Sequence, residues 1–205
     1  MSENVILKKI SERTYDDAIS FHGHSCGGLA LGYVAALYAK ELLDLDYSED
    51  EEVVVITETD SCTVDAIQTI LGTTAGKGNL FVNNWGKTAF SFYNRTTGKS
   101  VRLIMKPDFF KPSPEMDALR AKVFSGTATE EETARYHELS DQRVDNILAT
   151  HGSEVYEVKE PQQSVPEKAK IFDNIICPIC NESVGVARCV EKDGQKICQF
   201  CAQKK

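Results

Sequence analysis

Hydrophobic residues along the first half of the chain predict alternating helices and strands. The apolar run over 29–43 is rich in alanine and leucine, and its length indicates a buried helix. The β-branched run over 53–57 predicts a buried strand, and the apolar residues that follow keep a helical period up to Gly72. Polar and apolar residues alternate over 87–93, and a second strand over 100–105 follows a glycine-containing turn, which predicts a β-hairpin.

The second half of the chain begins with a change in composition. Three prolines between 106 and 114 exclude a helix interior there. Thr129 and Glu132 have the spacing of a capping box, which predicts the start of a long and mostly charged helix. The elements expected in this half are helices over 113–126 and 129–149 and a strand over 154–160. The expected domains are a core over 1–160, a linker over 161–172 and a small C-terminal domain over 173–205.

Composition limits the classes of protein to which the chain can belong. Hydrophobic residues make up 41% of its 205 residues, which is enough for a real core and too much for disorder. The net charge of −8 argues against a nucleic-acid partner. No apolar run approaches the roughly 20 residues that cross a bilayer, and the N-terminus lacks the basic and apolar regions of a signal peptide. We therefore expect a cytoplasmic protein without a membrane partner, whose seven cysteines serve metal binding and chemistry rather than disulfides.

The C-terminal tail carries the strongest single motif. Two Cys-x-x-Cys pairs, Cys177 with Cys180 and Cys198 with Cys201, are separated by 17 residues. This spacing predicts one tetrahedral four-cysteine zinc site, and we expect a structural site because four thiolates leave no open position. Iron in place of zinc, or a redox pair of disulfides, are the alternatives. The remaining expectations for the tail are ribbon strands over 183–188 and 196–197, with Cys189 packed on the ribbon.

A second group of metal-ligand residue types lies near the N-terminus. His22, His24 and Cys26 occupy alternate positions, and side chains two residues apart point to the same side of an extended segment. Two glycines follow and let the backbone approach whatever is bound there. Cys26 also lies just before the predicted helix over 29–43, where the helix dipole favours the thiolate.

Cys62 occupies a similar place in the next part of the chain. It follows the strand predicted over 53–57 and precedes a helix that Ser61 or Thr63 would cap. Because Cys26 and Cys62 both lie at helix N-termini, we expect them to face each other across one cleft.

The glycine-rich segment over 72–80 is not a phosphate-binding loop. Its spacing is one residue short of the Walker pattern, Gly78 replaces the magnesium-binding hydroxyl residue, and a helix rather than a strand precedes it. Its single lysine, Lys77, either reaches an anionic ligand or is an exposed residue beyond a helix C-cap.

Together these motifs resemble the FmdE family, whose members are associated with tungsten and molybdenum formylmethanofuran dehydrogenases. The segments 21–32, 58–68 and 72–80 carry the resemblance, and the zinc-ribbon tail is similar to that of many members. The resemblance implies an α+β core, a homodimer and a cleft lined by the His-x-His-x-Cys and Cys-x-x-Asp segments. The site residues that it implies are His22, His24, Cys26, Cys62, Asp65, Gln68 and Lys77. Gly27 departs from the proline of many relatives, which is expected to loosen the helix start without removing a ligand.

The expected fold is therefore α+β, with buried helices packed on a mainly antiparallel sheet and a small four-cysteine zinc-ribbon or treble-clef-like domain. One functional hypothesis is a core cleft that binds a second, divalent or redox, metal with an open coordination position. Its metal ligands are His22, His24, Cys26 and Cys62, and its catalytic residues are Cys26, Cys62, Asp65 and Lys77. The other hypothesis is a zinc-ribbon interaction or regulatory protein without catalytic activity. The interpretation that we favour combines them as a metal-binding accessory protein of a molybdenum or tungsten oxidoreductase.

Overall fold

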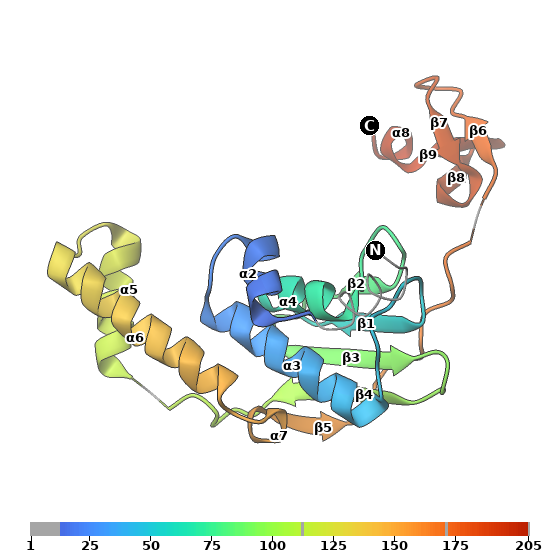
Figure 1. Ribbon diagram of the computed structural model, residues 1–205. Helices are drawn as coiled ribbons and strands as arrows, with labels where there is room; N and C mark the ends of the chain where they lie inside the picture. Colours follow the sequence, from blue (N-terminus) through green and yellow to red (C-terminus); the bar gives the residue numbers. More distant parts are fainter. Residues whose placement is uncertain (1–12, 112, 171, 205) are drawn as a thin grey trace, which may run out of the picture. The chain divides into compact units, whose positions relative to one another are not determined.

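The computed structural model describes residues 13–111, 113–170 and 172–204 (Figure 1). The chain divides into two compact units, Met1–Lys168 and Ala169–Lys205. The first described helix begins at Tyr15.

The larger unit is built on a five-stranded sheet with the strand order β2-β1-β3-β4-β5. The strands are β1 (Val53–Thr57), β2 (Leu80–Val82), β3 (Ala89–Asn94), β4 (Ser100–Met105) and β5 (Tyr156–Lys159). Only the pair β1 and β2 is parallel among these neighbours, and the others are antiparallel. The expected α+β fold with a mainly antiparallel sheet is thereby confirmed.

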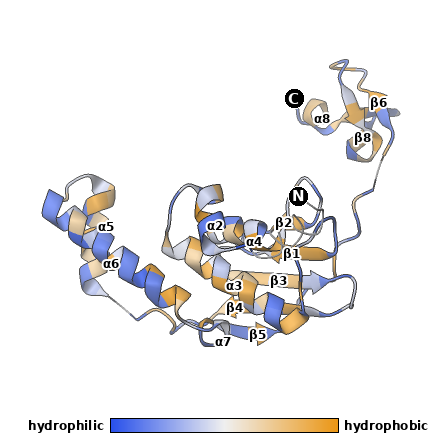
Figure 2. Cartoon of the chain, in the orientation of Figure 1, coloured by the Kyte–Doolittle hydropathy of each residue, from blue (hydrophilic) through white to orange (hydrophobic). Residues whose placement is uncertain are grey.

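Three helices of the first half of the chain surround the region that contains His22, Cys26 and Cys62. They are α2 (Tyr15–His22), α3 (Gly27–Leu43) and α4 (Thr63–Leu71). Apolar side chains of α3 and α4 pack with those of the central strands in the main hydrophobic core, to which Phe90, Phe92 and Leu103 contribute large buried side chains. Figure 2 shows the resulting concentration of apolar residues along β1.

Helices α3 and α4 pack closely because a glycine lies at their contact. A Cβ atom built on Gly32 would lie only 2.2 Å from the carbonyl oxygen of Thr63, so a larger residue would force the two helices apart. Gly32 is in the second turn of α3 and Thr63 is the first residue of α4. The contact therefore brings the N-terminal ends of both helices together.

A helical hairpin of α5 (Pro114–Ser125) and α6 (Glu130–Leu148) lies between β4 and β5 in the chain (Figure 1). The expected capping box is present, because Thr129 Oγ1 accepts from the Glu132 amide and Glu132 accepts from the Thr129 amide. Much of α6 is polar (Figure 2), while Val144 and Ile147 near its C-terminal end are buried in the core beside α3. The short helix α7 (Gly152–Val155) then leads into β5.

The smaller unit consists of two hairpins, a 3-10 turn and a terminal helix around a cluster of cysteines. Its elements are β6 (Asn174–Ile176), β7 (Ser183–Gly185), η1 (Val186–Arg188), β8 (Cys189–Lys192), β9 (Gln195–Cys198) and α8 (Gln199–Gln203). The strand expected over 183–188 is too long, because the 3-10 turn interrupts it after Gly185. Cys189 lies on the ribbon as the first residue of β8, with its thiol donating to the carbonyl of Gly185 at 3.6 Å.

None of the described helices combines the length and the apolar character that a membrane span requires.

Candidate metal centres

The backbone around His22 differs from the extended segment expected there. His22 is the last residue of α2, and Gly23 ends the helix in the left-handed region with φ 99°. The backbone is extended at Cys26, which has φ −156° and ψ 163°. The donor atoms of His22, His24 and Cys26 nevertheless lie within 4.8 Å of one another. A helix end and a glycine turn, rather than the alternation of an extended strand, bring them together.

Cys26 lies at the N-terminus of α3, as expected. It is the N-cap residue, and its Sγ accepts a hydrogen bond from the Leu29 amide at 3.3 Å. Tyr15 donates to the carbonyl of Cys26 at 3.3 Å, and its hydroxyl also lies 3.0 Å from the Ser25 hydroxyl. These contacts hold the sulfur and the backbone of Cys26 in one orientation.

Cys62 lies beside Cys26 at the start of α4. A Cβ atom built on Gly28 would lie 3.8 Å from Cys62 Sγ and 3.9 Å from Cys26 Sγ, so this glycine faces both thiols. Burial, and then the neighbouring Cys26 sulfur, raise the pKa of the Cys62 thiol. The expected cap of α4 is wrong, because the hydroxyls of Ser61 and Thr63 bond to each other at 3.0 Å and Cys62 itself is the N-cap position.

Asp65 orients the imidazole of His22. Its Oδ2 lies 2.7 Å from His22 Nδ1. Its Oδ1 accepts a hydrogen bond from the side-chain Nε2 of Gln68 at 3.1 Å. Because a carboxylate only accepts, Nδ1 carries a proton, and in the neutral imidazole Nε2 is then the nitrogen with the lone pair that can bind a metal. That Nε2 atom lies 4.0 Å from Cys26 Sγ. A carboxylate behind a histidine is the usual support of a histidine that binds metal.

A cavity of about 280 Å³ opens beside these groups. Its lining residues are His22, Asp60, Ser61, Cys62, Val64, Asp65 and Val82. Val82 carried no recognisable motif in the sequence, because it reaches the cavity only through the pairing of β2 with β1. Asp60 lies two residues before Cys62 in the loop after β1.

Lys77 lies apart from this group. Its Nζ donates to the carbonyl oxygens of Ser48 at 2.6 Å and Glu49 at 3.4 Å, and it does not line the cavity. Gly72 ends α4 in the left-handed region with φ 69°, so Lys77 follows the C-terminal end of the helix whose N-terminal end carries Cys62. Burial lowers the pKa of Lys77.

A buried ion pair supports the loop that carries Cys62. The Nε and a terminal nitrogen of Arg102 donate to the two carboxylate oxygens of Glu58 at 2.6 and 2.8 Å. Glu58 is the first residue after β1, and both partners are 3% exposed. This bidentate pair ties the start of the loop to β4.

The four cysteines of the tail form a separate cluster. The sulfur atoms of Cys177, Cys180, Cys198 and Cys201 all lie within 4.8 Å of one another. Backbone amides donate to these sulfurs, as Cys198 N does to Cys177 Sγ at 3.4 Å and Cys201 N does to Cys198 Sγ at 3.3 Å. The Cys198 amide, followed by those of Cys180 and Ile179, lowers the pKa of Cys177 to about 6. Four thiols at this separation can hold a metal ion.

Comparison with known proteins places the core in a family. The family model described as "FmdE, Molybdenum formylmethanofuran dehydrogenase operon" matches residues 21–157. The chain belongs to the FmdE family. The match contains the core group from His22 to Asp65 and ends before the four cysteines of the tail.

Two relatives extend the comparison beyond the FmdE model. A protein of Archaeoglobus fulgidus with the name "Probable S-adenosyl-L-methionine-binding protein" is 29% identical over 198 residues, which are 90% of this chain and 51% of the relative. The chain thus spans about half the length of this curated relative. The crystal structure of a tungsten formylmethanofuran dehydrogenase FmdE-like protein from Syntrophus aciditrophicus matches with a TM-score of 0.60 and 22% identity, covering 95% of each chain. The structural match establishes a shared fold.

Proposed function

We propose that this FmdE-family chain is a metal-binding accessory protein with two metal centres, one in the core and one in the tail. The observation that carries the core centre is the convergence of imidazole and thiol donors from two chain segments. His22, His24 and Cys26 come from the first segment, with their donor atoms within 4.8 Å of one another. Cys62 comes from the second, and its sulfur lies with that of Cys26 around Gly28.

The donor set of the core centre selects a class of metal. Imidazole and thiolate donors suit zinc, iron, nickel or copper better than calcium or magnesium, which prefer oxygen. When bound there, such an ion supplies Lewis-acid or one-electron chemistry to a ligand in the adjoining cavity of about 280 Å³. Because the side chain of His24 is exposed, we infer that this side of the centre remains open to small molecules.

Asp65 has a supporting role in this proposal. It accepts a hydrogen bond from His22 Nδ1–H and so fixes the tautomer in which Nε2 faces the metal position. Gln68 in turn holds the other oxygen of Asp65. Lys77 has no assigned role at this centre, because its ammonium group is bound to the carbonyls of Ser48 and Glu49.

In the tail we propose a structural zinc ion. Four thiolates complete a tetrahedral zinc shell and leave no position for a substrate. The tail forms only short strands and one short helix, so a metal ion would supply much of its folding free energy. Reduced thiols are required at both centres, which fits a protein of the cytoplasm.

The partners are part of the same proposal. The description of the FmdE family model names the molybdenum formylmethanofuran dehydrogenase operon. This description supports a molybdenum or tungsten oxidoreductase as the partner of the chain. We propose a homodimer as the assembled form and the tail as the docking module. A tail that docks a partner without any core metal would be the alternative.

Metal analysis of the full chain separates these hypotheses. We expect two metal ions per chain in the wild type, one in the double variant Cys177→Ser with Cys180→Ser, and one in the double variant His22→Ala with Cys26→Ser. The matched control is Cys189→Ser, which removes a cysteine that belongs to neither cluster and leaves two ions. A single ion in the wild type, lost only with the tail cysteines, would rule out the core centre.

A further inference from the structure

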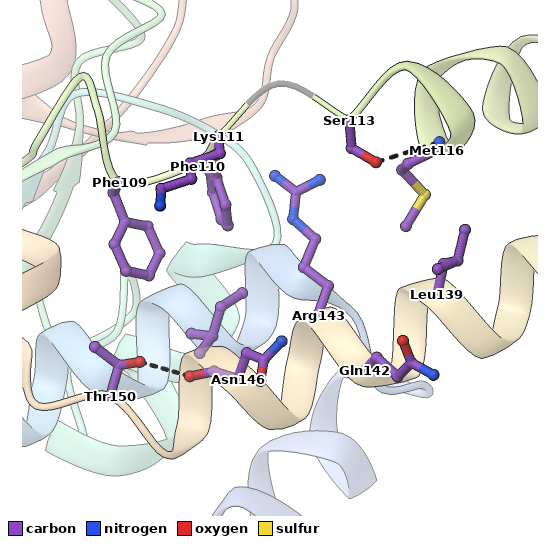
Figure 3. Close-up of a pocket in the computed structure, with 11 residues that line it drawn as sticks. Phe109, Phe110, Lys111, Ser113, Met116, Leu139, Gln142, Arg143, Asn146 and Thr150 are labelled. Carbon is purple, nitrogen blue, oxygen red and sulfur yellow. Dashed lines mark hydrogen bonds between the residues drawn. The ribbon is translucent and has the colours of Figure 1, made fainter.

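A second and larger cavity lies outside the metal centres. It has a volume of about 410 Å³ and lies between the segment after β4 and the helices α5 and α6 (Figure 3). Much of its wall consists of the apolar side chains of Phe109, Phe110, Met116, Leu139 and Ile147. This volume and this lining are typical of pockets for small organic ligands.

Arg143 gives this cavity a specific polar group. Its Cζ atom lies 3.7 Å from the centroid of the Phe110 ring, and Figure 3 shows the guanidinium extending from α6 toward the opposite wall. The contact with the ring face holds the guanidinium by a cation–π interaction. Burial is the largest cause that lowers the pKa of Arg143, so its charge is partly withdrawn from water.

Arg143 has no carboxylate partner in the part of the chain that the structure describes. The acid whose charge reaches Arg143 is Asp117, and its carboxylate pairs with Arg120 at 3.2 Å rather than with Arg143. Lys111 also lines the cavity and adds a second positive charge. A half-buried guanidinium without an anion, next to apolar walls, is a site that an external anion completes.

We propose that this cavity binds a small organic acid with an apolar body. The carboxylate pairs with the planar guanidinium of Arg143, whose donors match two carboxylate oxygens. The apolar chain or ring of the ligand lies against Met116, Leu139 and Ile147. A phosphate ester is the less favourable occupant, because its second charge would be buried among mostly apolar side chains.

Calorimetric titration of the full chain with decanoate tests this site. We expect saturable binding with one decanoate per chain, and at least about tenfold weaker binding by Arg143→Gln, because charge-assisted hydrogen bonds are lost. Arg135→Gln is the matched control, since it removes an exposed arginine of α6 that neither lines the cavity nor acts on Arg143. Its affinity for decanoate should equal that of the wild type.

A second variant keeps the test decisive if Arg143→Gln does not fold. Leu139→Trp fills the cavity and leaves Arg143 in place, and it should abolish decanoate binding. Decanol, which has the same chain without the charge, should bind at least about tenfold more weakly than decanoate. Equal binding of decanoate by the wild type and Arg143→Gln, no saturable binding, or tighter binding of decyl phosphate than of decanoate would each overturn the proposal.

Discussion

The carboxylate of Asp65 and the missing side chain of Gly28 define the core centre at the level of single residues. Asp65 lies 2.7 Å from His22 Nδ1 and sets the direction of the other ring nitrogen. Gly28 faces the sulfur atoms of both Cys26 and Cys62. One residue thus orients a ligand, and the other leaves the space in which two ligands meet.

Replacing Asp65 by asparagine should weaken metal binding at the core centre. An amide is a poorer acceptor than a carboxylate, and loss of such an outer-shell partner typically costs about 10–100-fold in metal affinity. Competition with a chromophoric chelator measures this change. Asp60→Asn is the control, because Asp60 lines the same cavity but forms no hydrogen bond with His22 among the described residues. Equal affinities of the two variants would contradict the role of Asp65.

Replacing Gly28 by alanine should also weaken core metal binding. The added Cβ would lie 3.1 Å from Cys62 Cβ and would push Cys62 away from Cys26. Gly27→Ala is the matched control, because its Cβ would meet only Ile147 at an ordinary 3.8 Å. The control should keep the metal affinity of the wild type and change the free energy of unfolding by less than about 1 kcal/mol, because Gly27 is the first residue of α3 rather than an interior one. Metal titration and thermal unfolding of both variants provide the measurements, and full metal affinity in Gly28→Ala would refute the crowding argument.

At the level of elements, the relative positions of the helices depend on a few contacts across long stretches of chain. Gly32 lets α3 approach the start of α4, and Tyr156 in β5 donates to the carbonyl of Leu31 in α3 at 2.8 Å. Burial raises the pKa of Tyr156 well above its usual value. Both contacts fix α3, which carries Cys26 at its N-terminus.

Gly32→Ala should destabilise the larger unit. Its Cβ would lie 2.2 Å from the Thr63 carbonyl, so α3 and α4 must separate, at a cost typical of overpacking of about 1–3 kcal/mol. Chemical denaturation measures the change, with Gly27→Ala again as the control in the same helix. Because the separation also moves Cys62 away from Cys26, the variant should lose core metal. An unchanged denaturant concentration at the midpoint of unfolding would show that the contact between Gly32 and the Thr63 carbonyl is not tight.

Tyr156→Phe should reveal a pH-dependent contribution to stability. At pH 7 the variant loses the hydrogen bond to Leu31 and should be less stable than the wild type by about 0.5–1.5 kcal/mol. Because the folded-state pKa of Tyr156 is raised, its contribution is present below pH 10 and is lost as the pH rises above the pKa of the unfolded chain. The difference in unfolding free energy between the two proteins should therefore narrow above pH 10. A constant difference from pH 8 to pH 11 would contradict this linkage.

At the level of the whole molecule, the two compact units depend on different interactions. The larger unit has an extensive core of apolar side chains from helices and strands. In the smaller unit the buried cluster consists of Cys177, Cys198 and Cys201 with Ile197. So small an apolar cluster does not offset the conformational entropy of the segment without further support.

Removal of metal by a chelator should therefore unfold the smaller unit and leave the larger one folded. In NMR spectra, amides of Ala169–Lys205 should lose their dispersion, while those of the five-stranded sheet keep theirs. Adding two equivalents of zinc, enough for both proposed centres, should restore the lost signals. Persistence of dispersed tail signals in the metal-free protein would show that the cysteine cluster folds without an ion.

Several features of the fold followed from local patterns in the sequence. The strand over 53–57, the start of the long helix after Cys26 and the capping box at Thr129 agree with the structure, because each depends on residues that are neighbours in the chain. The extended segment expected around His22 was wrong, because the end of α2 and the positive φ of Gly23 determine its course.

The sequence alone determined the kinds of donor atoms, their spacing along the chain and the positions of most helices and strands, since these depend on short-range propensity and periodicity. Only the tertiary structure decided that Cys62 lies beside Cys26, that Lys77 binds the carbonyl groups near Ser48, and that a cavity forms around Arg143. These three outcomes depend on how elements far apart in the chain pack, and the packing at Gly32 illustrates the reason. A missing side chain is visible in the sequence, but the backbone that occupies its space is not.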